Sequence, residues 1–221
     1  MINKADQDII KRTKDFVKKS LTDAEGGHDW YHTMRVYNNA LLISKTEKVN
    51  LFVVQLAALL HDIADSKFYD GDDTVGPKIA RDFLFKHNVD SSIIEHVVKI
   101  IENLSFNKSL DNENLFVSKE LEVVQDADRL DAIGAIGIAR AFNYGGFKNR
   151  PLYHPEIPPN LNMSTSEYKT STAPTINHFY EKLLLLKDQM NTPSGKHLAE
   201  GRHAFMETYL KKFYDEWNGL M

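Results

Sequence analysis

The stretch Leu51-Phe-Val-Val-Gln-Leu-Ala-Ala-Leu-Leu60 is nearly all apolar and is followed at once by His61-Asp62. Its length and its lack of charge predict a buried, central helix over residues 50–63. A histidine and an aspartate at the edge of such a helix both lose water, which is costly unless each side chain gains a partner. A metal ion would be a partner for both side chains. The pair therefore predicts a metal site at the end of the central helix.

Helical periodicity covers most of the remaining chain. Asp29 is the expected N-cap of one helix, and the last helix is expected to open after Thr192-Pro193. No series of alternating residues indicates a strand, and no internal repeat occurs. The sequence predicts an all-α fold, a single-domain helical bundle over residues 1–221. The expected helices cover residues 5–20, 30–47, 50–63, a segment with Pro77 near its start, 91–104, 118–141, 176–190 and 194–217.

Residues 143–175 lack this periodicity, because Gly145-Gly146, several prolines and a Ser/Thr cluster interrupt them. Irregular stretches of this length inside a compact domain are typically functional lids or disordered segments. We expect a lid between the metal-binding core, residues 20–140, and the C-terminal helices, residues 176–217. A long surface loop or a dimer contact is the alternative.

Composition excludes several classes of function. The 221 residues include no cysteine, so His and carboxylate side chains remain as metal ligands. A net charge of −4 argues against binding to duplex nucleic acid. The longest apolar stretch, about ten residues, is too short to span a bilayer, and the N-terminus lacks a signal-peptide pattern. We expect a soluble cytoplasmic protein without membrane or duplex nucleic-acid partners.

Two further residues complete a candidate ligand set: His32 in Asp29-Trp-Tyr-His32, and Asp128 before Arg129. Imidazole suits transition metals and carboxylates suit harder ions, so this set predicts one divalent ion such as Mn, Co, Ni, Fe or Mg. Four protein ligands in an octahedral shell leave about two positions for water or substrate, as in catalytic sites. Taken singly, His32 has an alternative role as a satisfied helix histidine, and Asp128 as a cap or ion-pair partner.

Three segments carry a resemblance to a known family: His28-Asp-Trp-Tyr-His32, Leu59-Leu-His-Asp-Ile-Ala-Asp-Ser-Lys67 and Asp126-Ala-Asp-Arg-Leu-Asp-Ala-Ile-Gly134. They resemble segments of the HD-domain metal-dependent phosphohydrolase superfamily, and more closely of its small bacterial hydrolases. The resemblance covers most of residues 20–140. It implies a helical core and a divalent metal held by His32, His61, Asp62 and Asp128.

The resemblance also implies hydrolysis of a phosphoester or phosphoanhydride in a nucleotide. The subgroup is similar to nucleoside and deoxynucleoside triphosphate pyrophosphohydrolases, which release a monophosphate and pyrophosphate. The alternatives are a 5′-nucleotidase or other nucleotide phosphodiesterase or phosphatase, a non-catalytic nucleotide-binding sensor, and an all-α interaction module. A homodimer is the default expectation for such hydrolases.

Four residues are candidates for catalysis. Asp65 follows Asp62 by three positions, so a helical turn would place both on one face, and nucleotidase-type relatives carry an acidic residue there. We expect Asp65 to act as general base or acid, with Asp70 at a further acidic position. Lys67 would hold a phosphate, and its alternatives are a solvated lysine or an ion pair with Asp65. His96 is a candidate phosphate contact or proton donor, or a packed helix histidine.

Other residues are expected to surround the substrate. Arg129 and Asp131 flank Asp128, where an Arg–carboxylate pair would orient the ligand. Arg140, one helix later, would reach a phosphate or an acid. His178, Lys182 and Arg202 would close the pocket from another side, or serve structural roles. In the lid, aromatic side chains would stack a base and basic ones would meet phosphates: Tyr144, Phe147, Tyr153, Lys148 and Arg150.

Overall fold

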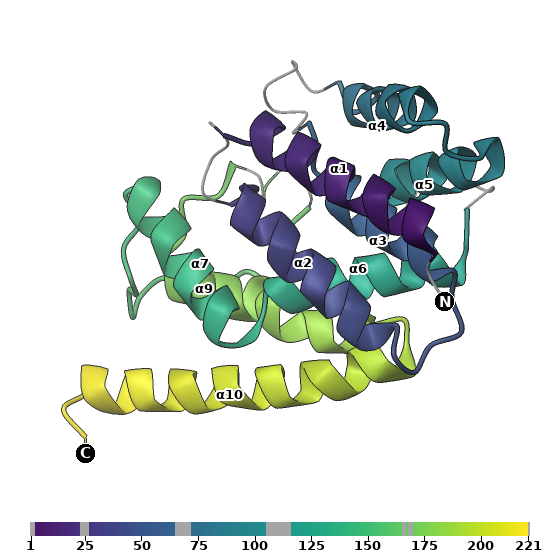
Figure 1. Cartoon of the computed structure of the whole chain (residues 1–221). Coiled ribbons are helices and arrows are strands. Elements are labelled where there is room, and N and C mark those ends of the chain that lie inside the picture. Colours follow the sequence, from purple (N-terminus) through teal and green to yellow (C-terminus); the bar gives the residue numbers. More distant parts are fainter. Residues whose placement is uncertain are drawn as a thin grey trace. The chain divides into compact units, whose positions relative to one another are not determined.

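The structure, a computed structural model, describes residues 3–22, 27–64, 72–104, 116–164, 167 and 170–220. In these residues the fold is all-α, with nine bounded α-helices, one 3-10 helix and no strand, which confirms the expected fold class (Figure 1). The chain divides into two compact units, Met1–Asp128 and Arg129–Met221, each of which is described by itself. The single-domain organisation stays a prediction.

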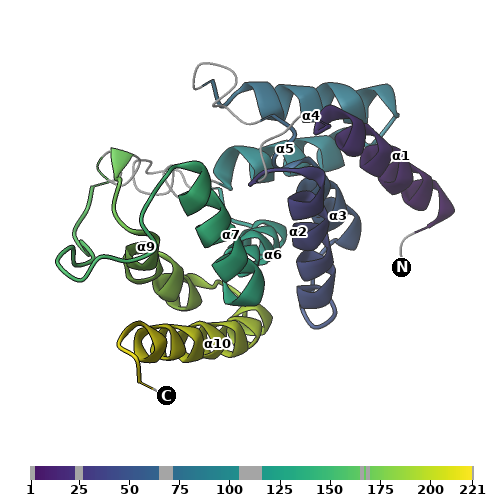
Figure 2. The same ribbon diagram turned by 90° about the vertical axis from the view of Figure 1, so that its left-hand side faces the viewer.

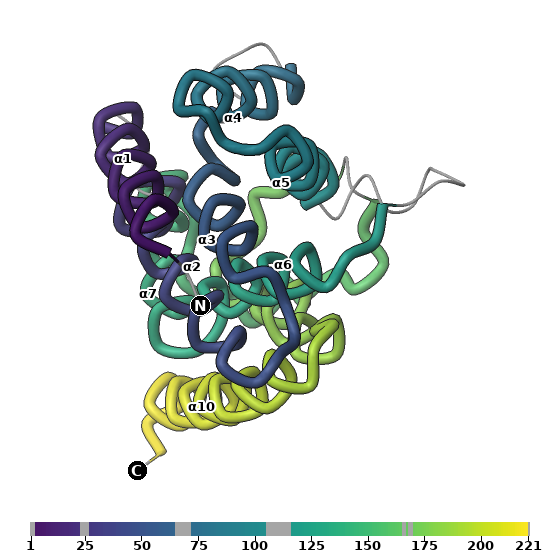
Figure 3. The backbone as a smooth tube through the Cα atoms, turned by 45° about the vertical axis from the view of Figure 1, so that its right-hand side comes forward, coloured from purple at the N-terminus to yellow at the C-terminus, as the bar shows by residue number. Residues whose placement is uncertain are grey.

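The first unit is built around α3, Leu51–Leu60, which contacts α1, α2 and α5 (Figure 3). From Val53 to Leu60 every residue of α3 is buried, which confirms the central helix expected from the apolar run. Figure 2 shows α4 and α5 side by side, and the two helices are in contact. The bounds are α1 Lys4–Ser20, α2 Trp30–Ile43, α4 Val75–Lys86 and α5 Ser91–Asn103, and α6, Lys119–Asp131, begins in this unit.

Polar side chains fix where the helices begin. The carboxylate of Asp29 accepts a hydrogen bond from the backbone N–H of His32 at 2.7 Å, which confirms Asp29 as the N-cap of α2. Asn50 caps α3 in the same way, through the backbone N–H groups of Phe52 and Val53. Such caps satisfy N–H groups that the first turn of a helix leaves without partners. The start of α2 is therefore set locally, and with it the position of His32.

Two buried hydrogen bonds tie α2 to its neighbours. The Tyr37 hydroxyl donates to Gln55 Oε1 of α3 at 2.5 Å, and Asn39 Nδ2 donates to the carbonyl of Ala127 in α6 at 3.1 Å. Each bond is costly to break, because it would leave a buried polar group without a partner. They hold the helices that carry the candidate ligands against one another.

The second unit contains α7 Gly134–Phe147, α9 Thr175–Glu181, the 3-10 helix η3 Leu183–Gln189 and α10 Pro193–Trp217. Here α10 contacts α7 and η3, and α9 contacts α7 and η3. Thr192 Oγ1 accepts from the backbone N–H of Gly195 at 2.9 Å, which confirms the expected start of the last helix. Within the part of the chain described, none of the helices combines the length and apolarity that a bilayer crossing requires.

The helix expected over residues 118–141 is wrong as one element. It breaks at Ala132 and Ile133, and α7 begins at Gly134 with φ of 75°, a left-handed conformation that favours glycine. A Cβ on Gly134 would lie 3.0 Å from side-chain carbons of Arg202. The Arg202 guanidinium donates to the carbonyl of Leu130, so an arginine from α10 closes the end of α6.

Two other expected boundaries shift. Helix α3 ends at Leu60, which leaves His61 and Asp62 in the turn that follows. The segment expected as one helix over residues 176–190 divides into α9 and η3 at Lys182, whose φ of −145° is not helical.

The expected lid, residues 143–175, opens with the last turn of α7 and continues as turns and irregular chain over residues 148–164. Tyr153 packs edge-on against three aromatic rings of α10, with the nearest ring centroid 5.1 Å away. The backbone carbonyl of Pro151 accepts from the N–H of Thr175 at 2.9 Å. This part of the segment is therefore attached to the C-terminal helices of its own unit.

Candidate metal centre

Two imidazoles form the buried side of the candidate site. His61 Nδ1 donates to the carbonyl of Ala58 at 3.0 Å, which leaves the lone pair of Nε2 free to face the site. His32, in the first turn of α2, places its Nε2 3.4 Å from His61 Nε2. Both side chains are 1 % exposed.

Two carboxylates form the more exposed side. Asp62 Oδ2 lies 3.3 Å from each of the two imidazole Nε2 atoms, and Asp128 Oδ1 lies 3.5 Å from that of His32. The Asp62 side chain is 24 % exposed and that of Asp128 is 43 % exposed. Ligand atoms about 2.1 Å from one ion stand roughly 3.0–3.4 Å apart in octahedral or tetrahedral shells. The separations among His32, His61 and Asp62, and the separation of Asp128 from His32, are thus close to those around one ion.

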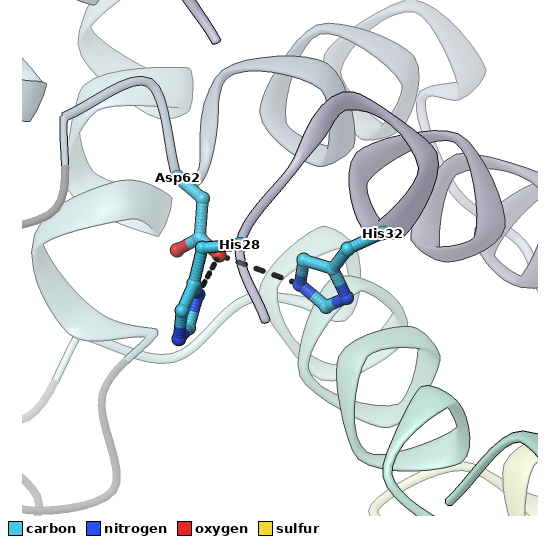
Figure 4. A group of neighbouring side chains, drawn as sticks. All are labelled: His28, His32 and Asp62. Atoms are coloured by element: carbon cyan, nitrogen blue, oxygen red, sulfur yellow. Dashed lines mark hydrogen bonds and ion pairs between the residues drawn. The ribbon is translucent and has the colours of Figure 1, made fainter. Parts of the chain in front are cut away.

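A third histidine, which sequence reasoning did not select, joins the cluster. His28 Nδ1 lies 2.6 Å from Asp62 Oδ2, and Figure 4 shows His28 and His32 both facing that carboxylate. Among the residues that the structure describes, two groups have ligand atoms within 4.8 Å of one another: His28, His32 and Asp62, and His32, His61 and Asp128. The available signal for His28 was its place four residues before His32, in the same motif.

The electrostatics of the site favour positive charge. Burial lowers the pKa of His61, but the charge of Asp62 and its hydrogen bond, with the charge of Asp128, outweigh burial and raise that pKa to about 9. Burial raises the pKa of Asp62, but the charge of His61 and hydrogen bonds from three imidazoles hold it well below its usual range. Without a metal, a proton on His61 therefore supplies the positive charge, and a divalent ion would have to displace that proton.

Of the four candidate catalytic residues, three fall outside the described residues and the fourth, His96, is in neither group of candidate ligands. Asp65, Lys67 and Asp70 fall outside the described residues, and α3 ends before Asp62, so this helix does not provide the turn expected to join Asp62 to Asp65. His96 belongs to neither ligand group.

The contacts of His96 are with the chain around the start of α6. Its Nε2 is 3.0 Å from Ser118 Oγ and 3.6 Å from Glu120 Oε2, and its ring meets Phe116 edge-on. Ser118 Oγ also accepts from the backbone N–H of Leu121, so it caps the first turn of α6. These contacts are those of a histidine packed between two helices.

The residues expected around the substrate have defined partners within the second unit. Arg129 donates to the carbonyl of Gln189 at 2.5 Å, and Arg140 donates to the buried carboxylate of Asp131 at 2.5 Å. The cationic side chains of the lid lie over its aromatic rings, with Lys148 above Phe147 and Tyr144.

His178 of α9 lies in a basic environment. Burial lowers its pKa, and the positive charges of Lys182 and Arg150 lower it further, to about 4. His178 is therefore neutral at physiological pH. Arg150 also lies over the ring of Tyr144, with its guanidinium carbon 5.4 Å from the ring centroid.

Known proteins share both the sequence pattern and the fold. The sequence profile of the HD domain family matches residues 29–133. The uncharacterized protein YpgQ of Bacillus subtilis is 39 % identical over 212 residues, which cover 95 % of this chain and 94 % of YpgQ. A crystal structure of an HD-superfamily hydrolase from Bacillus thuringiensis matches with a TM-score of 0.77 at 44 % identity, over 96 % of this chain and 98 % of that one.

The crystal structure of YpgQ in complex with ADP matches with a TM-score of 0.76 at 34 % identity, over 96 % of each chain. These similarities run through both compact units, whereas the family profile covers α2 to the end of α6. The four candidate ligands, His32, His61, Asp62 and Asp128, all fall inside the profile. The chain therefore belongs to the HD-domain phosphohydrolase superfamily.

Proposed function

We propose that this protein is a divalent-metal-dependent nucleotide hydrolase, and that it cleaves a nucleoside or deoxynucleoside triphosphate to the monophosphate and pyrophosphate. The observation that carries the proposal is the convergence of His32, His61, Asp62 and Asp128 in a partly exposed cluster. Family membership supports hydrolysis, and the ADP complex of YpgQ supports a nucleotide ligand.

The donor set fits a divalent ion such as Mn, Co, Ni, Fe or Mg, because it combines imidazole nitrogens with carboxylate oxygens. When bound, the ion would polarise a phosphoryl oxygen and lower the pKa of a coordinated water. The buried imidazoles of His32 and His61 exclude solvent on one side. Substrate therefore approaches from the side of the carboxylates, where Asp128 is most exposed.

In the proposed reaction, water attacks the α-phosphorus and the bond from this phosphorus to the bridging oxygen breaks, so that pyrophosphate leaves. Asp65 takes the proton from the water. The two ligand carboxylates cancel the charge of a divalent ion, so other groups must offset the triphosphate charge, and we assign Lys67 to this role. Asp70 and His96 are further candidates, although His96 would have to give up its contact with Ser118.

A nucleotide-binding sensor without turnover is the second candidate, because the ligand in the YpgQ complex is a nucleotide. A 5′-nucleotidase, phosphatase or phosphodiesterase would use the same ligand set on another bond. These reactions differ in their products, since a pyrophosphohydrolase releases pyrophosphate and a nucleotidase releases orthophosphate.

The test is a nucleotide screen with the purified full chain. The protein is freed of metal, supplied with Mn, Co, Ni, Fe or Mg in turn, and given ribo- and deoxyribonucleoside tri-, di- and monophosphates. Pyrophosphate and orthophosphate are measured separately. We expect equal amounts of pyrophosphate and monophosphate from a triphosphate, and none from His61→Ala.

The matched control is His197→Ala, because this histidine is 86 % exposed and lies far along the chain from the ligands. If the protein released orthophosphate, and only from monophosphates, its activity would be that of a nucleotidase and the proposal would be wrong. Tight nucleotide binding with metal present and no product would favour the sensor. A wild-type protein that binds no divalent metal would contradict the proposal altogether.

A further inference from the structure

His28 stands apart from the other imidazoles around Asp62. It lies just before α2, its side chain is 40 % exposed, and its Nδ1 is 2.6 Å from Asp62 Oδ2 (Figure 4). The Nε2 atoms of His32 and His61 are both 3.3 Å from the same oxygen. The contact joins residues 34 positions apart, and so connects the start of α2 to the turn after α3.

The short distance identifies this contact as a hydrogen bond. Two ligands of one ion, each about 2.1 Å from it, are roughly 3.0 Å apart or more. The His28–Asp62 distance is shorter than that and close to the length of about 2.7 Å found in charge-assisted hydrogen bonds. A carboxylate that binds a metal carries no proton and can only accept, so His28 Nδ1 is the donor.

A second metal ion does not explain His28 either. His28 and Asp62 would need His32 as their third ligand. However, His32 Nε2 also faces His61 Nε2 at 3.4 Å and Asp128 Oδ1 at 3.5 Å. An imidazole nitrogen has one lone pair and binds one ion, so among the described residues the two ligand groups cannot both be filled through that atom.

We infer that His28 is a positioning residue for the proposed metal site: its Nδ1–H holds the Asp62 carboxylate in the orientation that the ion requires, and it is not itself a ligand. The χ2 torsion of an aspartate is broad, so an unsupported carboxylate turns easily. Asp62 sits in a turn beyond the end of α3, where no helix restrains it. Hydrogen-bond partners of metal ligands typically change metal affinity about 10–100-fold when they are removed.

The test measures metal binding rather than turnover. The metal-free full chain is titrated with Mn²⁺, and free Mn²⁺ is followed by electron paramagnetic resonance. We compare His28→Ala, which removes the donor, with His28→Asn, whose side-chain amide nitrogen takes a position similar to that of Nδ1. His197→Ala, on an exposed histidine, is the control. Thermal unfolding in EDTA establishes that the metal-free variants fold alike.

We expect one Mn²⁺ per chain throughout, with affinity about 10–100-fold weaker in His28→Ala, largely restored in His28→Asn and unchanged in His197→Ala. Two ions in the wild type and one in His28→Ala would make His28 a ligand and overturn the inference. Equal weakening in both His28 variants would also overturn it, because a donor alone would then not suffice. Unchanged affinity in His28→Ala would show that the carboxylate needs no support.

The inference rests on the proposed function, and the two fail in different ways. A wild type that binds no Mn²⁺ contradicts the metal site itself. A wild type that binds Mn²⁺ as well as His28→Ala does leaves the metal site in place and removes only the role of His28.

Discussion

Two histidines that lose water on folding acquire different charge states at neutral pH in the two compact units: His61 is positive and His178 is neutral. His61, at the end of α3, is surrounded by carboxylates, and its pKa rises to about 9. His178, in α9, is near Lys182 and Arg150, and its pKa falls to about 4. Burial lowers the pKa of both, so the neighbouring charges decide the difference. The comparison shows that only His61 lies in an environment suited to a cation.

Substitution of His61 or of its carboxylate partner Asp62 should have the largest effect on metal binding. We expect Asp62→Ala and His61→Ala to lose Mn²⁺ binding and nucleotide turnover by more than about 100-fold, because direct ligands contribute more than their hydrogen-bond partners. His178→Ala should bind Mn²⁺ as the wild type does. Titration with Mn²⁺ and pyrophosphate release measure the two effects. If His178→Ala also lost the metal, the contrast between the two histidines would be wrong.

The pH dependence of the metal-free protein follows from the raised pKa of His61. A folded-state pKa of about 9, above the ordinary histidine value of 6.5, contributes stability that is fully present below pH 6.5 and is lost as pH rises through 9. The free energy of unfolding should therefore fall by about 1.4 kcal/mol per pH unit in this range. Over the same range Mn²⁺ affinity should rise, because fewer sites hold the competing proton.

Urea unfolding in EDTA at several pH values measures the first effect, and Mn²⁺ titration measures the second. His61→Gln is the control, because it has no imidazole to titrate at this position. In this variant the free energy of unfolding and the Mn²⁺ affinity should change much less between pH 6.5 and 9. A wild-type stability that did not change between pH 6.5 and 9 would contradict the raised pKa.

The two pKa values can be measured directly by nuclear magnetic resonance on the metal-free protein. At pH 7 we expect the His61 ring to carry both protons and the His178 ring to be neutral. Nitrogen shifts of the imidazole rings distinguish these states. If both rings titrated near pH 6.5, the proposed difference between the pKa values of His61 and His178 would be wrong.

The smallest expected effect separates burial from charge at His178. Burial is the main cause of its low pKa, so Lys182→Met should raise that pKa by less than about one pH unit. The same resonance titration measures the change. A rise of the His178 pKa to the ordinary histidine value of 6.5 would instead make the charge of Lys182 the main cause.

Local pattern was enough to predict most of the helices. The apolar run of α3 and the cap at Asp29 are properties of neighbouring residues, and the structure confirms both. The four ligand positions could also be named, since each lies in a short motif, and the structure brings them together. Their role as ligands, and the roles of Asp65, Lys67, Asp70 and His96, stay predictions.

Features that depend on distant residues could not be predicted. The break before Gly134 falls in a run of small apolar residues that fits a helix on either side, and its geometry involves Arg202. The contact of His28 with Asp62 joins residues 34 positions apart, and the place of His28 four residues before His32 does not reveal it. Sequence spacing describes neighbours along one element, whereas these contacts exist only after separate elements pack.

The closure of α6 by Arg202 has a consequence for biosynthesis. The last carbonyls of a helix lack partners within it, and that of Leu130 accepts from the backbone N–H of Ile133 at 3.4 Å and from a side chain 72 residues later. A chain leaves the ribosome from its N-terminus, so Asp128 is synthesised well before the residue that completes its helix. The Leu130 carbonyl can thus gain the hydrogen bond from Arg202 only after the first ten residues of α10 have been synthesised. A nascent chain stopped before residue 202 would hold all four candidate ligands but would lack the Arg202 hydrogen bond at the end of the helix that carries Asp128.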